Sequence, residues 1–385
     1  MIVYKAYKFR LYPNNNQKNL IHQTFGCTRF IYNYFLNKKD EYYEETKKNL
    51  SLSDIKKELV LLKKENNWLK EVDSMSLTTT LDNLDRAYTN FFNKKGSHPI
   101  YKKRGVKDSY KTINIRSSYQ RNNYSNIILN LNDNTIKLPK LGIIPIRGYR
   151  NLDKELDIIN ATITKEANKY YVSLCVREKI EDKDVKLNHA IGIDLGVTSL
   201  ITTSEGIKYD KLNIKRIEKH IEKLQQRLSR CVKGSNNYYK IKNRIARLYQ
   251  KIRNMRKFYL HKITTKLVKE NDLIVCENLE TKKMIEKKES KTLTKGIVNA
   301  CFSEITRELE YKTKWYFKKL IKINTYYPSS KICSHCGYRN AINDLSIREF
   351  KCINCNNFND RDINASINIL DEGIRLAIEN KIITA

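Results

Sequence analysis

Four cysteines near the end of the chain constrain its fold more than any other feature of the sequence. They are spaced as C-x2-C-x15-C-x2-C, and the acidic stretch NDRDINA follows closely after the last one. Two such pairs on tight turns complete the tetrahedral thiolate shell of a zinc ribbon. Because four protein ligands leave no position open for substrate, we expect one structural Zn²⁺ that shapes the following loop, with His335 as a bystander. The predicted ligands are Cys333, Cys336, Cys352 and Cys355.

Positive charge dominates the composition. The 385 residues include 74 Lys and Arg against 42 Asp and Glu, a net charge of +32, which favours a polyanionic partner such as nucleic acid. A lysine-rich genome bias would explain part of the excess but not the shortage of acids. No apolar run approaches the ~18 residues of a membrane span, and the first residues lack a signal-peptide core. We therefore expect two or three domains, a reducing cytoplasmic compartment and no membrane partner.

The first half of the chain predicts a small β-domain with an inserted helical block. Residues 1–13 alternate like a strand, residues 14–98 have helical periodicity, and residues 99–187 return to short strands, with a hairpin around Ala167-Asn168. Within the helical block, a core stripe behind a Ser74 cap comprises Leu77, Leu81, Leu84, Tyr88 and Phe91. A basic loop follows, and a solvated turn and a phosphate-contacting loop are equally good interpretations of Lys102, Lys103 and Arg104.

The second half, residues 188–385, predicts a mixed α/β domain. Three short strands with turns at Gly196 and Gly206 lead into a long helical hairpin, followed by a strand, a helix and another strand. The zinc ribbon occupies about 328–360 in this scheme, and a helix closes the chain. Periodicity predicts an inner face on that helix made of Ile367, Leu370, Ile374 and Ile378.

Acidic residues in apolar strands are the sharper signal for chemistry. Asp194 ends AIGID and Glu277 ends LIVCE, and acids are rarely placed in such strands without a partner. Strand-end capping or an ion pair is the alternative for either residue alone. A third acid precedes the last helix, where Asp360 and Asp362 are both candidates and where Asp362 would also serve as a helix N-cap. Such a cluster suits two Mg²⁺ or Mn²⁺ ions about 4 Å apart in an RNase H-like core.

Several motifs, in this order, resemble the TnpB (OrfB) proteins of bacterial insertion sequences, RNA-guided nucleases related to the type V CRISPR effectors. They are IGIDLGV, CENLE, CSHCG and CINCNNFNDRDINASINI. The likeness covers nearly the whole chain, because YKFRLYPNNNQKNLIHQTFGCTRFIYNYFL, SLTTTLDNLDRAYTNFF and IKLPKLG resemble the same family. The ribbon standing just before the last acid is the most specific feature.

The resemblance implies an α+β multidomain fold. A β-barrel-like wedge domain (residues 1–13 and 99–187) would carry a helical recognition domain (14–98), followed by a RuvC-like nuclease domain with the inserted ribbon. It also implies a triad in which the third acid of the D-x-N-A element is Asp362: Asp194, Glu277 and Asp362. Ser74 and Thr78 would face the motif beside the target, although many relatives carry Gln at the Thr78 position. Many relatives also have Gly where this chain has Asn356, which tolerates left-handed backbone.

The implied function is cleavage of double-stranded DNA, directed by a guide RNA from the transposon end. Two rivals stay open: a nuclease-inactive, RNA-guided DNA-binding regulator, and an RNase H-like transposase. We expect a monomer, with a dimer as the alternative. The expected location is the bacterial cytoplasm at the nucleoid, or the nucleus for a eukaryotic or viral relative.

Overall fold

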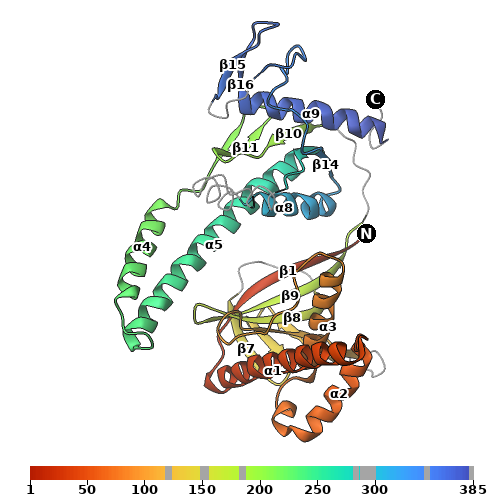
Figure 1. Ribbon diagram of the computed structural model, residues 1–385, viewed down its shortest axis with the longest axis vertical. Coiled ribbons are helices and arrows are strands. Elements are labelled where there is room, and N and C mark those ends of the chain that lie inside the picture. Colours follow the sequence, from red (N-terminus) through yellow and green to blue (C-terminus); the bar gives the residue numbers. More distant parts are fainter. Residues whose placement is uncertain are drawn as a thin grey trace. The chain divides into compact units, whose positions relative to one another are not determined.

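The computed structural model describes residues 1–117, 124–147, 156–181, 188–280, 286, 301–341 and 347–380. The chain folds into two compact units, Met1–Ile180 and Glu181–Ala385 (Figure 1).

An antiparallel seven-stranded sheet forms the centre of the first unit, in the order β2-β8-β9-β1-β7-β6-β5. Strand β1 pairs with β9 along its whole length, so the start of the chain is fixed to a strand far along the sequence. The predicted hairpin between β8 and β9 is confirmed, with Ala167 and Asn168 both in left-handed backbone as a tight hairpin turn requires. The strands are β1 (Ile2–Leu11), β2 (Ser109–Ile113), β5 (Ile128–Asn130), β6 (Thr135–Leu138), β7 (Gly142–Arg147), β8 (Asp157–Glu166) and β9 (Lys169–Lys179), with a separate pair β3 (Arg116–Ser117) and β4 (Tyr124–Ser125).

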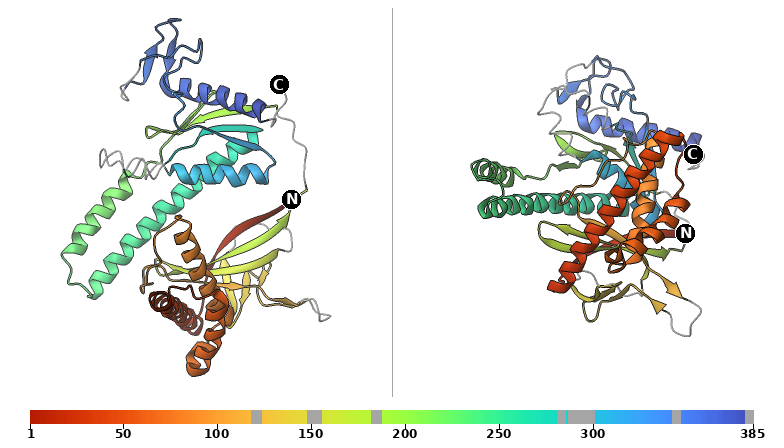
Figure 2. Two further views of the ribbon diagram at one scale, coloured as in Figure 1. Left: turned by 45° about the vertical axis from the view of Figure 1, so that its right-hand side comes forward. Right: turned by 60° about the horizontal axis from the view of Figure 1, so that its bottom comes forward.

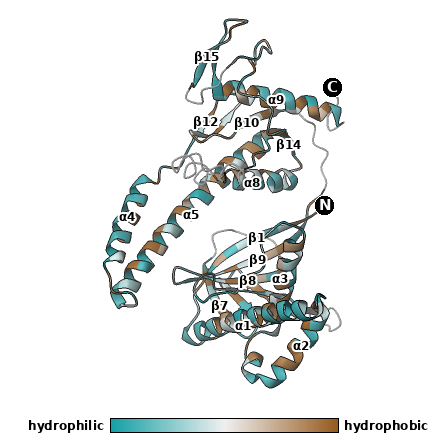
Figure 3. Cartoon of the chain, viewed as in Figure 1, coloured by the Kyte–Doolittle hydropathy of each residue, from teal (hydrophilic) through white to brown (hydrophobic). Residues whose placement is uncertain are grey.

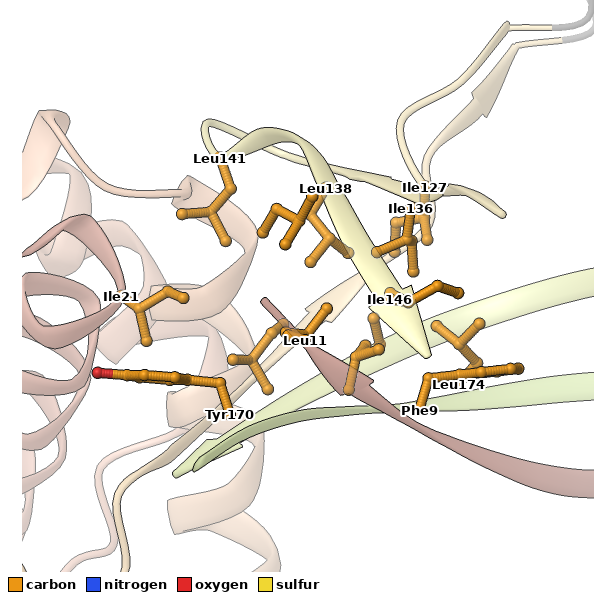
Figure 4. Close-up of a cluster of buried hydrophobic side chains, with 14 of the residues drawn as sticks. Phe9, Leu11, Ile21, Ile127, Ile136, Leu138, Leu141, Ile146, Tyr170 and Leu174 are labelled. Carbon is orange, nitrogen blue, oxygen red and sulfur yellow. The ribbon is translucent and has the colours of Figure 1, made fainter. Parts of the chain in front are cut away.

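Helices pack against this sheet through a shared apolar core. Figure 4 shows Ile21 of α1 pointing toward Leu11 and Tyr170 of the sheet, and all three are buried. A second apolar cluster lies among the helices themselves. The helices are α1 (Asn15–Thr46), α2 (Leu52–Glu65), the 3₁₀ turn η1 (Asn67–Lys70) and α3 (Ser74–Phe92).

The cap of α3 differs from the sequence prediction. Ser74 is the first helical residue, and the preceding Asp73 is the N-cap, accepting hydrogen bonds from the backbone N–H groups of Met75 and Ser76. The prediction of a Ser74 cap is therefore wrong by one residue, because a carboxylate at the N-cap also satisfies the first free N–H groups and suits the positive end of the helix. The predicted apolar stripe is buried from Leu77 to Tyr88.

The second unit is built on a five-stranded sheet in the order β12-β11-β10-β13-β14. Strands β10, β13 and β14 are parallel, and β11 and β12 continue the sheet antiparallel. Helices α5 and α8 cover one face and α9 covers the other (Figures 1 and 2). The elements are β10 (Ala190–Asp194), β11 (Ser199–Thr203), β12 (Lys208–Asp210), α4 (Lys215–Ser229), α5 (Asn236–Glu270), β13 (Leu273–Glu277), α8 (Phe302–Trp315), β14 (Lys319–Ile323), β15 (Glu349–Lys351), β16 (Phe358–Asp360) and α9 (Arg361–Glu379).

The helical hairpin of α4 and α5 extends from this sheet. Its two arms share an apolar seam that includes Ile221, Leu224 and Ile252. Hydrophilic residues make up much of both helices (Figure 3), consistent with the Lys- and Arg-rich sequence of the two arms.

Small residues, rather than the predicted isoleucines, let α9 lie close to the sheet. One row of buried residues recurs every fourth position and is mostly small: Ala365, Ile369, Gly373 and Ala377, whereas Ile367 is half-buried and Ile378 is exposed. A Cβ on Gly373 would stand 2.3 Å from a Val275 methyl carbon. The predicted inner face was therefore wrong at its two ends, because close helix-to-sheet contact selects for small side chains over large ones.

Candidate active site and metal centre

Two acidic residues end adjacent parallel strands. Ile193 of β10 pairs with Cys276 of β13, so the next position along both strands brings Asp194 beside Glu277. Neighbouring strands are about 4.8 Å apart, and residues in register share a face of the sheet. Gly192, two residues before Asp194, contacts α9, so both carboxylates lie on the α9 face at the carboxyl edge of the sheet.

The first turn of α9 brings a third acid to this edge. Asp362 lies in that turn, and its charge adds to burial and to the charge of Glu277 in raising the pKa of Asp194. The positive end of the α9 dipole favours negative charge there. Acids from three distant segments thus meet at one place.

The electrostatics of this cluster favour a bound cation. Burial, and after it the charges of Glu277 and Asp362, raise the pKa of Asp194 to about 7 against the opposing effects of the Leu195 N–H and Arg361. Burial also raises the pKa of Glu277. Carboxylate oxygens are the donors that a hard divalent ion such as Mg²⁺ prefers, and in this structure the three carboxylates lie less close together than the four thiols described below.

Asp360 has a different role from Asp362. Its carboxylate caps α9 by accepting hydrogen bonds from the N–H groups of Asp362 and Ile363, 3.1 and 3.0 Å away, and it pairs with Lys208 at 2.6 Å. Burial raises the pKa of Asp360, but Lys208 and the N–H groups outweigh that effect and hold it below its usual range. The sequence left open whether Asp362 serves only as the N-cap of the last helix. In the structure, Asp360 is that N-cap.

The four predicted zinc ligands form a compact thiol cluster. Their sulfur atoms all lie within 4.8 Å of one another, and the Cys333–Cys355 and Cys336–Cys352 sulfur pairs are both 3.7 Å apart. A tetrahedral Zn²⁺ with Zn–S bonds of about 2.3 Å requires sulfurs about 3.8 Å apart, so the donor set and its spacing fit zinc. Among the described residues, no other group of three or more His, Cys, Asp or Glu side chains has its ligand atoms this close together.

Both cysteine pairs sit on turns with the same backbone geometry. Gly337 and Asn356 hold equivalent positions, each directly after the second cysteine of a pair, with φ of 73° and 58°. Asn356 thus adopts left-handed backbone, which Asn was expected to tolerate at this position. Side-chain amides point at the sulfurs: Asn340 toward Cys352 at 3.7 Å, Asn354 toward Cys336 at 3.6 Å and Asn359 toward Cys333 at 3.7 Å. His335 is exposed and lies outside the cluster.

The structure also shows site residues that the sequence prediction missed. Ser329 donates a hydrogen bond to Glu277 Oε1 at 2.6 Å. Arg348 Nη1 lies 3.5 Å from Asp362 Oδ1, while its Nη2 donates to Thr198 Oγ1 at 2.8 Å. Asn364 and Asn368, four residues apart on α9, are buried. The spacing of these two asparagines on a core-facing helix could have been recognised in the sequence. No local sequence pattern pointed to Ser329 or Arg348.

The candidate nucleic-acid contacts all lie in the first unit and vary in accessibility. The Lys102 ammonium stands 3.7 Å from the centre of the Tyr32 ring, and desolvation, followed by repulsion from Lys107, lowers its pKa to about 8. By accessible surface, Lys102 is nevertheless exposed, as are Lys103 and Arg104. Arg104 also lines a hollow of about 300 Å³ with two more basic residues, Arg29 and Lys165.

Ser74 and Thr78 lie at the start of α3. Ser74 Oγ accepts a hydrogen bond from Lys63 at 2.6 Å. Thr78 is half-buried, and its hydroxyl donates to the Ser74 carbonyl oxygen at 3.3 Å. Both hydroxyls therefore have partners within the protein.

The fold of the whole chain has a counterpart among solved structures. The chain of a cryo-EM structure described as the Cas12f1–sgRNA–target DNA complex superposes with a TM-score of 0.62, covering 96% of this chain and 98% of that one at 15% identity. The chain therefore has the mixed α/β fold of this class of protein.

Curated relatives assign the family. A Streptomyces pristinaespiralis protein named "Putative RNA-guided DNA endonuclease" is 32% identical, covering 97% of this chain and 90% of its own length. An Escherichia coli K12 protein, InsQ, has the same description and is 31% identical over 96% of this chain and 92% of its own. The chain belongs to the TnpB (OrfB) family of RNA-guided DNA endonucleases, as its motifs predicted.

Family models match three segments. Residues 173–288 match the IS605 OrfB model described as probable transposase, and residues 302–369 match the TNB domain described as Cas12f1-like. Residues 1–48 match a model described as a helix-turn-helix domain, although here they form strand β1 and the single helix α1. No helix in the described part of the chain is both long and apolar enough to cross a bilayer.

Proposed function

We propose that this chain is an RNA-guided DNA endonuclease of an insertion sequence, cutting double-stranded DNA beside a short target-adjacent motif. Full-length likeness to relatives of that description supports the activity. The net charge of +32 suits a protein that binds a guide RNA and a target duplex together.

The observation that carries the mechanism is the meeting of three acids at one edge of the second sheet. Asp194 and Glu277 end paired parallel strands, and Asp362 lies in the first turn of the helix packed over them. These three residues are proposed as the catalytic and Mg²⁺-binding set of a RuvC-like nuclease domain, residues 188–385. When bound, two divalent ions would supply activation of water and stabilisation of the leaving oxygen during phosphodiester hydrolysis.

The protein's own contribution is to hold its carboxylates in place. Strand pairing fixes the backbone of Asp194 against that of Glu277, and the capping of α9 by Asp360 fixes the turn that carries Asp362. The four thiolates are proposed to bind one structural Zn²⁺ at about residues 328–360, which holds the segment leading into that turn.

The first unit is proposed to bind nucleic acid. In this scheme residues 1–13 and 99–187 form a wedge domain around a recognition domain of residues 14–98. Lys102, Lys103 and Arg104 are candidates for phosphate contacts because all three are exposed, and the Lys102 ammonium also lies against the Tyr32 ring. Ser74 and Thr78 are weaker candidates because their hydroxyls already have partners.

The test uses protein co-expressed with the DNA that flanks its gene. In Mg²⁺, we expect cutting of a plasmid that carries the matching target beside a randomised motif. Cutting should require the RNA and disappear in Glu277→Ala, while the matched control Asp371→Asn, on a later turn of α9, stays active. RNA-guided binding without cutting would favour the regulator, and cutting without RNA would favour the transposase.

A further inference from the structure

A buried serine holds one oxygen of Glu277. Ser329 lies between β14 and the first zinc-cluster cysteine, 52 residues along the chain from Glu277, and its hydroxyl donates to Glu277 Oε1 at 2.6 Å. The residue is only 5% exposed. A hydrogen bond to an ionised, buried carboxylate is stronger than one between neutral groups and fixes the side-chain orientation. The other oxygen, Oε2, is then the atom available to a cation.

Two asparagines hold the backbone around that serine. The Asn368 amide donates to the carbonyl oxygens of Ser329 and Ile332, both at 2.7 Å. Asn364 donates to the same Ile332 oxygen at 2.7 Å, and its Oδ1 accepts the Ser334 N–H at 2.8 Å. Because both amides are almost fully buried, releasing these bonds would leave polar groups without water, and the network is correspondingly rigid.

This network joins the two candidate metal sites. Ser334 directly follows the zinc-cluster residue Cys333, Asn364 is two residues after Asp362 on α9, and Ser329 contacts Glu277. One set of buried hydrogen bonds therefore spans the thiol cluster, the third acid's helix and the second acid's strand.

We propose that Ser329 is a positioning residue that orients Glu277 for divalent-ion binding, and that Asn364 and Asn368 keep it in register with the zinc cluster. This inference rests on the proposed function, since it assigns Glu277 a role toward a cation. The inference also gives the zinc cluster a role beyond local folding, because the segment that the cluster anchors carries Ser329.

The substitution Ser329→Ala isolates the hydroxyl, because the Ser329 carbonyl keeps its bond from Asn368. Partners that orient metal ligands typically change metal affinity by about 10- to 100-fold. We expect Mn²⁺ binding to the zinc-loaded, full-length protein, followed by the EPR signal of free Mn²⁺, to weaken by about that factor. Zinc content and RNA-guided target binding should stay at wild-type levels, and Ser329→Thr, which keeps the hydroxyl, should recover the affinity.

A matched control is Ser366→Ala. Ser366 is a fully buried serine on α9 whose hydroxyl donates to the backbone carbonyl of Ile363 at 2.7 Å rather than to a carboxylate, so its loss should leave Mn²⁺ affinity unchanged. Asn368→Ala should weaken Mn²⁺ binding in the same direction as Ser329→Ala. The double variant should lose less than the product of the two single effects, because both act through one contact.

Three results would overturn the inference in distinguishable ways. Wild-type Mn²⁺ affinity in Ser329→Ala would show that the hydroxyl does not orient Glu277. Loss of zinc in Ser329→Ala would show that it acts on the ribbon's folding instead. If wild-type protein bound no more Mn²⁺ than Asp194→Ala, the carboxylate metal site of the proposed function would itself fail.

Discussion

The substitution Gly192→Ala tests whether close packing of α9 sets the active-site geometry. A Cβ at this position in β10 would stand 2.1 Å from the Ser366 carbonyl oxygen and 2.8 Å from the backbone nitrogen of Leu370. Both atoms belong to the α9 backbone, so the whole helix must move, by about 1 Å, to restore ordinary contact distances. Such overpacking costs about 1–3 kcal/mol, which lowers the melting temperature of a unit of this size by about 2–12 °C.

The same movement should impair cutting more than binding. The helix carries Asp362, whereas Asp194 and Glu277 stay on the sheet, and a displacement of about 1 Å at reacting groups costs about 100-fold in rate. Calorimetry of the zinc-loaded protein and plasmid cleavage by the guided complex measure the two effects. RNA-guided target binding should be retained, because the acids are not required for it.

The control is the same chemical change in α1. Gly26 has open space around its Cβ position, so Gly26→Ala should stabilise the helix by up to about 1 kcal/mol and leave cutting intact. If Gly192→Ala melted within about 1 °C of wild type, a smaller change than the least decrease expected, and cut at the wild-type rate, the argument from helix packing would be refuted.

Three further predictions concern the acids and the thiols. Asp362→Asn should abolish cutting. Asp360→Asn should retain cutting because Asn can still cap the helix. The opposite pattern in a cleavage assay would reverse the assignment of the third acid. Cys352→Ser should release zinc and lower the melting temperature, as metal analysis and calorimetry would show, and full activity without zinc would contradict its structural role. In zinc-loaded protein without Mg²⁺ or Mn²⁺, the raised pKa of Asp194 means that its stabilising protonated form is lost as pH rises from about 4 toward 7. Asp194→Asn should therefore melt higher than wild type at about pH 8 and not at about pH 4, and equal melting temperatures at both would argue against the raised pKa.

Local sequence patterns predicted the elements that depend on neighbours in the chain. The cysteine spacing indicated two matching turns, and the structure brings the four sulfurs within 4.8 Å of one another. The hairpin at Ala167-Asn168 needs only two left-handed residues between alternating strands. Acids at the ends of apolar runs identified Asp194 and Glu277 because an ionised group in such a strand requires a partner.

Sequence patterns over a few residues were insufficient where packing depends on a surface formed by residues far away in the chain. The large side chains of α9 suggested an inner face that reaches Ile378, which is exposed, because the sheet accepts Gly373 and Ala377 instead. For Lys102 the sequence left a solvated turn and a phosphate contact equally open, and it gave no sign that Tyr32, far earlier in the chain, lies against the Lys102 ammonium. A local sequence pattern does not contain the shape of the distant surface against which α9 or Lys102 packs.

The sequence by itself determined the family, most of the helices and strands and the thiol cluster, and it put forward all three acids as candidates, since these follow from spacing, periodicity and motif order. Only the tertiary structure showed that Asp360 caps α9 and pairs with Lys208, a role that leaves Asp362 as the candidate for the third acid. It alone also brought Ser329 to Glu277. The physical reason is that these contacts join segments far apart in the chain, and their geometry exists only after the sheet, α9 and the ribbon have packed together.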